Sequence, residues 1–335
     1  MKKLIATLLL LTTFISLCLV FTSCKPEDDV QIKIGYMAGP TGIGMAKLIG
    51  DFGGEEATEQ YDFIKYNDTA NANTDLMSGV LDIACLPTNE AAKFYNSVNP
   101  NMQVLAINCL NSLCLLTNDN VQINSIEDLE GKTIYTCKNG TPRIILNKLL
   151  EAYGINAKVV FTLGEGDTAE TILTPQEIPS KLILPNKADI ILAPEPIVSN
   201  ALSKPVAKHK VTLDLGALWD AKFDTPIAMG CIAVRSEFAK EHPIAVRNFL
   251  EEYESSIEFM SDPANLDTAA QLVLDAGIMA ELAPAKSAIT NLGNAIAYID
   301  GEDMKNTLIN VYNVFGTAVI GGKLPDDEFY YEDKK

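Results

Sequence analysis

The sequence predicts an α/β fold of two lobes built to one plan, each with a sheet flanked by helices. Two passages carry this prediction, because each is a short apolar run that an Asp-Ile pair opens and a proline closes. The first passage spans residues 81–90 (LDIACLPTNE), and the second spans residues 188–196 (ADIILAPEP). Apolar runs of this length between turn residues are typical of strands buried in a parallel sheet.

A second matching unit lies upstream of each run and has the order strand, polar loop, helix. In the first half it consists of residues 32–36 followed by 39–42, and in the second half of residues 133–135 followed by 139–142. Ligands bind beyond the carboxyl ends of the strands in open α/β sheets. Polar loops at these ends in both lobes therefore predict a ligand held between the lobes.

The remaining elements follow from apolar periodicity and turn residues. Strands are expected at residues 31–37, 63–66, 82–86, 104–107, 113–117, 132–136, 158–162, 189–193, 211–215 and 227–234. Helices are expected at residues 45–49, 74–80, 142–152 and 179–184, and from Glu90, Ile197 and Pro243 onward. Ser125 and Asp128 form a capping-box pattern for a short helix that ends at Gly131.

The long C-terminal region is expected to be helical from Pro243 to about Phe315. The apolar stripe of its first helix consists of Val246, Phe249, Leu250, Tyr253, Ile257 and Met260. The acidic and polar tail, residues 326–335, is expected to be loosely held.

The two lobes are discontinuous in the sequence. We expect the first lobe to comprise residues 31–110 and 228–335, and the second lobe residues 111–227. The chain then crosses between the lobes near residues 108–112 and again near residues 225–229. Two neighbouring crossings form a two-strand hinge about which the lobes can close. The sheets are expected to be mixed and mostly parallel.

The N-terminus has the pattern of a secretory signal. Two lysines precede an apolar run, residues 4–20, and Cys24 follows small residues. Residues 1–23 are therefore expected to be a lipoprotein signal peptide, Cys24 the acylated N-terminus of the mature chain, and residues 24–30 a charged tether. An uncleaved membrane anchor is the alternative, since the run is long enough to span a bilayer. Both interpretations place the rest of the chain outside the cytoplasmic membrane.

Composition narrows the possible partners. The formal net charge is −18 and only three arginines occur, which argues against nucleic acid and anionic lipid as partners. Five cysteines follow Cys24, namely Cys85, Cys109, Cys114, Cys137 and Cys231. Their odd number and irregular spacing indicate small buried side chains and no disulfide framework. A monomer is expected.

The sequence lacks the usual motifs of catalysis and metal binding. It contains two histidines, His209 between two lysines, where it is expected to be solvated, and His242 at a helix start. A His-x-x-x-His pair, a Cys-x-x-Cys pair and a Gly-x-Ser-x-Gly motif are absent. We therefore expect a protein that is not an enzyme and that uses no metal and no cofactor.

Polar residues just beyond the predicted strands are the candidates for ligand binding, because helix starts there expose free N–H groups. These candidates are Gly39, Pro40, Thr41, Gly42, Thr88, Asn89, Asn139, Gly140, Thr141, Arg143 and Glu195. Each loop can also be an ordinary strand-to-helix turn, with Thr88 and Asn89 as helix caps and Arg143 as a solvated surface residue. A phosphate loop is excluded, because Lys47 lies too far beyond the last glycine of that turn.

Several passages, taken together and in order, resemble one family. They are residues 39–45 (GPTGIGM), 79–84 (GVLDIA), 87–89 (PTN), 125–132 (SIEDLEGK), 194–196 (PEP), 229–231 (MGC), 234–238 with 242–243, and 321–327. Over nearly all of residues 30–335 the chain resembles bacterial ABC-transporter substrate-binding lipoproteins of the nitrate/sulfonate/taurine and thiamine-pyrimidine-precursor superfamily.

The resemblance implies a type II periplasmic-binding-protein fold with a closing cleft. It also implies a lipid-anchored receptor that captures a small polar organic ligand, of sulfonate, carboxylate or pyrimidine type, and delivers it to a permease driven by an ATPase. A ligand-sensing or adhesive surface lipoprotein is one alternative. A thiamine-pyrimidine synthase-like enzyme is another, against which the scarcity of histidines and the export signal both argue.

Overall fold

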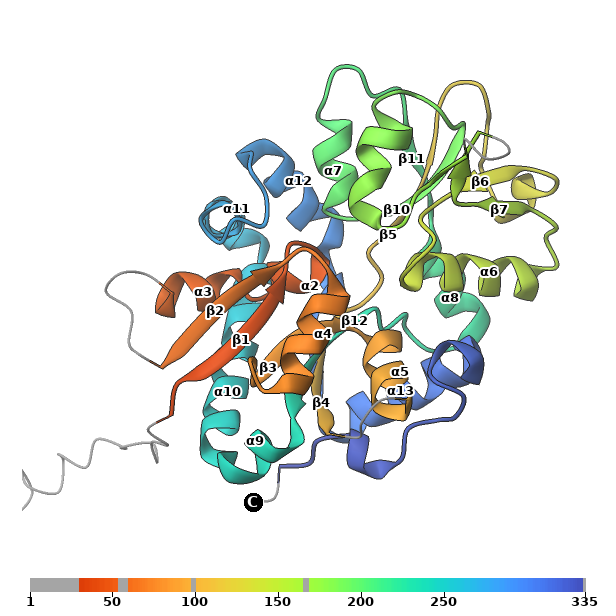
Figure 1. Cartoon of the computed structure of the whole chain (residues 1–335). Coiled ribbons are helices and arrows are strands. Elements are labelled where there is room, and N and C mark those ends of the chain that lie inside the picture. Colours follow the sequence, from red (N-terminus) through yellow and green to blue (C-terminus); the bar gives the residue numbers. More distant parts are fainter. Residues whose placement is uncertain (1–29, 54–59, 98–100, 165–168, 334–335) are drawn as a thin grey trace, which may run out of the picture.

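The computed structural model describes residues 30–53, 60–97, 101–164 and 169–333 (Figure 1). The expected signal peptide, Cys24 and all of the tether except Val30 lie outside these residues. The described chain forms two lobes, each built on one sheet with helices packed against it. In the described part of the chain no helix is both long and apolar enough to cross a membrane.

The first lobe is built on a six-stranded sheet with the order β13-β4-β12-β3-β1-β2. Its strands are β1 (Ile32–Met37), β2 (Tyr61–Tyr66), β3 (Ile83–Pro87), β4 (Met102–Cys109), β12 (Gly230–Arg235) and β13 (Ile296–Asp300). Its helices are α2 (Pro40–Ile43), α3 (Ala46–Phe52), α4 (Thr69–Ser78), α5 (Thr88–Ser97), α9 (Ser236–Glu241), α10 (Pro243–Ser261), α11 (Leu266–Asp275), α12 (Leu282–Leu292) and α13 (Gly301–Phe315).

The second lobe is built on a five-stranded sheet with the order β11-β5-β10-β6-β7. Its strands are β5 (Leu113–Thr117), β6 (Thr133–Tyr135), β7 (Lys158–Val160), β10 (Ile190–Pro194) and β11 (Lys210–Asp214). A separate pair, β8 (Thr162–Leu163) and β9 (Glu170–Thr171), is antiparallel. The helices are α6 (Thr141–Tyr153), α7 (Ile197–Leu202) and α8 (Leu215–Phe223), with a π-helix at Pro179–Ile183.

Both sheets are mixed and mostly parallel in strand direction, as expected, because β12 and β13 in the first lobe and β5 in the second run against the other strands. In the first lobe β1 pairs in parallel with β2 and β3, whereas β12 pairs antiparallel with β3 and β4, and β13 with β4. In the second lobe β6 pairs in parallel with β7 and β10, and β5 pairs antiparallel with β10 and β11. Two strands cause the mixture in the first lobe: the returning strand β12 enters the sheet antiparallel to both neighbours, and β13 is antiparallel to β4 at the edge.

Local sequence signals explain several elements. The capping box of Ser125 and Asp128 is present and starts a short 3-10 helix at Ile126–Leu129. All six residues of the predicted apolar stripe on α10 are buried. Polar residues occupy the opposite face, so burial of this one stripe explains why the segment is helical.

Two expectations for the C-terminal region are wrong. The region is not continuously helical, because Ile296–Asp300 forms the edge strand β13. The tail is also not loosely held as far as Asp333. Phe329 is fully buried, and the Tyr331 N–H donates to the Val104 carbonyl at 3.0 Å. The aromatic side chains within this acidic tail supply the apolar surface that holds it against the first lobe.

The chain crosses between the sheets twice. The first crossing connects β4, which ends at Cys109, to β5, and the second connects α8 to β12. Met229 joins the two crossings. Its N–H donates to the Cys109 carbonyl at 2.9 Å, and its sulfur accepts contacts of 3.4 Å from the Ser112 N–H and hydroxyl. Both connecting segments lie outside the strands, so the expected two-strand hinge is instead a pair of adjacent loops.

Candidate functional site

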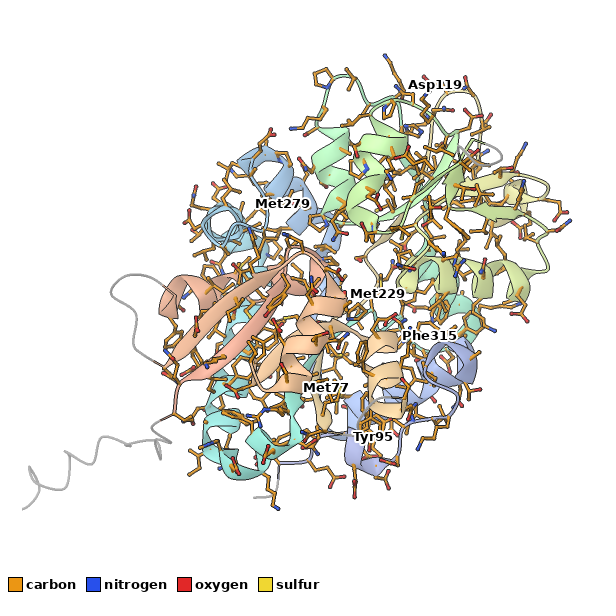
Figure 2. The ribbon with its side chains drawn as sticks, viewed as in Figure 1. Met77, Tyr95, Asp119, Met229, Met279 and Phe315 are labelled. Atoms are coloured by element: carbon orange, nitrogen blue, oxygen red, sulfur yellow. The ribbon has the colours of Figure 1, made fainter. Side chains whose placement is uncertain are left out.

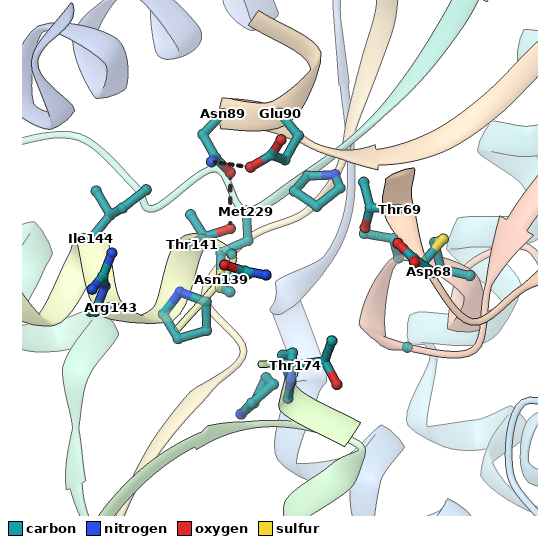
Figure 3. A pocket seen from close by; sticks show the side chains of 18 of the residues that line it. Asp68, Thr69, Asn89, Glu90, Asn139, Thr141, Arg143, Ile144, Thr174 and Met229 are labelled. Carbon is teal, nitrogen blue, oxygen red and sulfur yellow. Dashed lines mark hydrogen bonds between the residues drawn. The ribbon is translucent and has the colours of Figure 1, made fainter. Parts of the chain in front are cut away.

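A cleft of about 560 Å³ lies between the two lobes (Figure 3). The first lobe contributes the loops that follow β1, β2 and β3, and the second lobe those that follow β6 and β10. These are carboxyl ends of strands, the location that open α/β sheets use for ligands. Met229, from the second crossing, also lines the cleft, and it lies where the two lobes meet (Figure 2).

The structure brings together most of the residues that the sequence analysis proposed. Those that line the cleft are Gly39, Pro40, Thr41, Asn89, Asn139, Gly140, Thr141 and Arg143. Three others, Gly42, Thr88 and Glu195, do not line it. Residues adjacent to all three are part of the lining. Thr88 and Glu195 are excluded because their side chains point elsewhere, and Gly42 has no side chain that could reach the cleft.

Thr88 is fully buried and has a structural role. Its hydroxyl donates to the Ala228 carbonyl at 2.7 Å, and its N–H donates to the Met229 carbonyl at 3.1 Å. Its own carbonyl accepts a hydrogen bond from the Tyr312 hydroxyl at 2.9 Å. Thr88 therefore fastens the start of α5 to the second crossing, and its polar atoms are directed away from the cleft.

Gly42 is the close-approach position of the first loop. A Cβ atom at Gly42 would lie 2.0 Å from the Met37 carbonyl oxygen, which is far closer than atoms can approach. Glycine lets the short helix α2 fold back onto the end of β1. This close turn places Gly39, Pro40 and Thr41 in the cleft wall.

Glu195 follows β10 and is only 1% exposed. Its carboxylate accepts hydrogen bonds from the Ser199 N–H (3.0 Å), the Ser199 hydroxyl (2.9 Å) and the Asn291 side-chain amide (2.8 Å). Burial raises the pKa of this carboxyl above its ordinary value, against the effect of these donors, which lower it. Its neighbours Pro194 and Ile197 face the cleft, whereas the carboxylate faces α7 and α12.

Thr141 and Asn89 meet inside the cleft. The Thr141 hydroxyl donates to the Asn89 side-chain oxygen at 3.3 Å, and both residues are buried (Figure 3). Thr141 begins α6 of the second lobe, and Asn89 lies in the first turn of α5 of the first lobe. The contact therefore joins the lobes within the candidate site.

The cleft has cations on its second-lobe side. The Lys138 Nζ and Arg143 Cζ atoms lie 5.9 and 5.0 Å from the centroid of the Phe161 ring, so one aromatic ring orients both. Among the residues that the structure describes, neither cation is paired with a carboxylate. These two positive charges are therefore available to a ligand.

The acidic residues of the lining are already engaged by the protein. Asp68 caps α4 by accepting a hydrogen bond of 2.7 Å from the Ala70 N–H. Glu90 accepts one of 3.3 Å from the Asn89 amide and lies 3.8 Å from the Lys93 ammonium group. The described lining holds the cations Lys93, Lys138 and Arg143 against two carboxylates, so its formal charge is positive, although the whole chain is strongly acidic.

Among the described residues, the site offers neither a metal-binding group nor a reactive thiol. In the described part of the chain, His, Cys, Asp and Glu side chains form no group that could hold a metal ion. Burial raises the pKa of the Cys137 thiol, near the cleft, to about 11, so it stays protonated and unreactive at neutral pH. His209 is buried and not solvated as expected, because its Nε2 lies 2.6 Å from the Ala188 carbonyl oxygen.

Comparison with known proteins agrees with this geometry. A family model described as "NMT1/THI5 like" matches residues 60–265, which is more than half of the chain. The chain belongs to the NMT1/THI5-like family. A search of curated proteins finds no match.

Solved structures share the fold of this NMT1/THI5-like protein. An ABC transporter from Parabacteroides distasonis is 20% identical with a TM-score of 0.73, over 91% of this chain and 100% of that one. The periplasmic aliphatic sulphonate binding protein of Escherichia coli is 13% identical with a TM-score of 0.69, over 91% and 93%. The periplasmic nitrate-binding protein of Synechocystis is 15% identical with a TM-score of 0.59, over 82% and 74%.

Part of the lining of this NMT1/THI5-like protein was not among the residues predicted from its sequence. Asn67, Asp68 and Thr69 directly follow β2, so the rule that located the other loops would have found them. Lys138 directly precedes the predicted loop after β6. In contrast, no local signal marks Val319, which follows α13 and enters the cleft from a distant part of the chain.

Proposed function

We propose that this protein is the extracytoplasmic substrate-binding component of an ABC importer and that it captures a small organic anion in the interlobe cleft. The cations Lys138 and Arg143 in the cleft wall, which pair with no carboxylate of the described residues, carry this proposal. The N-termini of α5 and α6 add backbone N–H groups and the positive ends of two helix dipoles to the same cavity.

The lining favours sulfonates and carboxylates over pyrimidines. A flat heterocycle is usually held by stacking on an aromatic ring, but none of the described residues that line the cleft is aromatic. Met37, Ile144, Ile197 and Met229 supply flexible aliphatic surface instead. This surface suits a short apolar body that carries one anionic group.

Ligand capture is expected to involve closure of the lobes. We assign residues 31–110 and 228–335 to one moving body and residues 111–227 to the other, with bending near residues 108–112 and 225–229. The contacts of Met229 with Cys109 and Ser112 support this assignment, because they keep the two crossings together. A ligand that contacts both walls stabilises the closed state.

We also propose that the protein lies outside the cytoplasm. Cys24 would carry acyl chains and anchor a monomer to the membrane, close to a permease and an ATPase. The carboxylates of the cleft are engaged by the protein, which supports a binding role without catalysis. A ligand-sensing or adhesive lipoprotein is the competing role, and permease and ATPase genes beside the gene would argue against it.

Mass spectrometry of small molecules released from the purified and denatured protein tests the ligand class. We expect one dominant organic anion in near-stoichiometric amount, and Lys138→Gln with Arg143→Gln should remove it. A neutral heterocycle, or no small molecule in protein that still binds none of a panel of sulfonates and carboxylates, would refute the assignment.

A further inference from the structure

We propose that Glu195 is a positioning residue that latches the two lobes together through Asn291, and that it does not contact the ligand. This inference rests on the proposed function, since it names the contact that regulates closure of the same cleft. It replaces the role in ligand binding that the sequence alone suggested for Glu195.

The backbone places Glu195 where the cleft wall, the first crossing and α7 meet. The flanking residues Pro194 and Ile197 line the cleft. The Glu195 N–H donates to the Ser112 carbonyl at 2.7 Å, which ties the residue to the segment that must bend when the lobes move. A displacement of Glu195 is therefore transmitted directly to the wall of the cleft.

The donors around the carboxylate come from both lobes. Ser199, one turn along α7, supplies its N–H and its hydroxyl from the same lobe. Asn291 of α12 supplies the third donor, and its amide also donates to the Ser199 hydroxyl at 3.2 Å. A buried carboxylate needs such donors, so Asn291 stabilises the arrangement only while the lobes are together.

Helix α12 is held by the first lobe at both ends. Before it, the Tyr36 hydroxyl of β1 donates to the Ala276 carbonyl at 2.8 Å. After it, β13 pairs with β4 at the edge of the six-stranded sheet. The bond between Asn291 and Glu195 must therefore break when the second lobe moves away. Figure 1 shows α12 beside α7, at the boundary between the lobes.

A second polar contact lies on the same flank but is weaker. Lys204, beyond the end of α7, forms an ion pair with Glu281, which precedes α12. The side chains are 34% and 55% exposed, so solvent screens the pair and its contribution is small. The buried carboxylate of Glu195 is thus the stronger of the two polar links.

The first test compares Asn291→Ala with Thr290→Ala, a control at a neighbouring exposed position on α12. Both variants are made in the full mature chain, which is freed of ligand by unfolding and refolding. Loss of one charge-assisted hydrogen bond is expected to lower the ratio of closed to open protein about tenfold. X-ray scattering should show a larger radius of gyration for Asn291→Ala alone. Amide exchange should rise in residues 196–203 and 282–292, with the thermal midpoint nearly unchanged.

Unchanged scattering and exchange in Asn291→Ala would overturn the latch. So would wild-type protein that is already fully open without ligand. Both measurements are made without ligand, so an error in the proposed ligand class cannot affect them, whereas the mass-spectrometric experiment tests that class separately.

The second test exchanges the two partners. Asn291→Asp places a second carboxylate against Glu195, so repulsion between the two should open the lobes at neutral pH. Acidification should close the lobes again, because the pair of carboxylates takes up a proton. Glu195→Gln combined with Asn291→Asp reverses donor and acceptor and should restore closure at neutral pH. Failure of both rescues would show that α7 and α12 meet through packing alone.

Other groups nearby do not complicate this pH dependence. Burial and the charge of Glu195 raise the pKa of the Cys114 thiol to about 12, so it stays neutral in the range of the test. On α12, Lys286 is paired with Asp267 at 2.7 Å, and beyond α7 Lys204 is paired with Glu281.

Discussion

The Thr141 hydroxyl donates a hydrogen bond of 3.3 Å to the Asn89 side-chain oxygen and so joins the two lobes inside the cleft. The residues are 3% and 2% exposed. Each lies in the first turn of a helix whose N-terminus faces the cavity, so the bond holds two helix starts together. Thr141 therefore contributes to closure of the cleft as well as to its lining.

Thr141→Val is expected to weaken binding of the released ligand about tenfold, because closure loses one buried hydrogen bond while side-chain volume is nearly kept. Calorimetry with the ligand identified by mass spectrometry measures this effect. Thr268→Val, at an exposed position on α11, is the matched control and should bind as the parent does. Equal affinity of Thr141→Val and the parent would contradict a role of this hydroxyl in closure.

The second prediction concerns Lys138 and Arg143, the two cations on the second-lobe side of the cleft. Arg143→Gln and Lys138→Gln should each weaken binding of an anionic ligand by roughly tenfold and reduce its dependence on salt, because each removes a positive charge that no carboxylate of the described residues pairs with. Arg143→Lys should be intermediate, since it keeps the charge but loses the guanidinium group that lies over the Phe161 ring. Lys210→Gln, where the side chain is 69% exposed outside the cleft, should have no effect.

Most of the fold could be predicted because its signals are local. Buried strands such as β3 and β10 are apolar runs between turn residues, and the stripe on α10 repeats at helical spacing. β13 could not be separated from the helices around it, since a five-residue strand between two helices gives little periodicity. The buried tail was missed because its aromatic residues lie among acidic ones.

The site could be predicted as a set of loops but not as a set of side chains. The strand-end rule located Thr41, Asn89 and Thr141 correctly in the cleft wall. The direction of a side chain, however, depends on distant partners. Thr88 turns toward Ala228, 140 residues away in sequence, and Glu195 toward Asn291, 96 residues away. No local pattern contains such information.

Gly230→Ala is expected to destabilise the protein by about 1–3 kcal/mol through overpacking. A Cβ atom there would lie 2.2 Å from the Thr41 Cγ2 and 2.7 Å from the Asn108 Oδ1, so both side chains must move. Because Thr41 lines the cleft, ligand affinity should fall as well. Gly39→Ala is the control, since no atom lies within 4 Å of the added methyl group. Denaturant unfolding of both variants decides the matter.

The proposed lipid anchor at Cys24 is tested by the intact mass of protein extracted from membranes. We expect a mature chain that begins at Cys24 and carries acyl chains, since several chains give firm attachment where one is marginal. Cys24→Ser should release the protein from the membrane fraction without changing its fold. A native protein whose mass still includes residues 1–23 would show an uncleaved anchor instead.

The buried carboxyl of Glu195 should make folding stability depend on pH in a defined direction. Burial raises its pKa in the folded state, so the folded state holds the proton more tightly than the unfolded chain does. This contribution to stability is complete below the ordinary pKa of a glutamate and is lost as the pH rises through the raised value.

The Glu195→Gln variant tests this dependence, because it has no titratable carboxyl group at this position. The free energy of unfolding of the wild type, minus that of the variant, should therefore decrease from pH 4 to pH 8. Asp128→Asn is the control, because hydrogen bonds from the Asn124 and Ser125 N–H groups lower the pKa of Asp128, so the corresponding difference should not decrease over this range. An increase of the difference for Glu195→Gln over the same range would mean that hydrogen bonds from Ser199 and Asn291 outweigh burial and keep the carboxylate ionised in the closed protein.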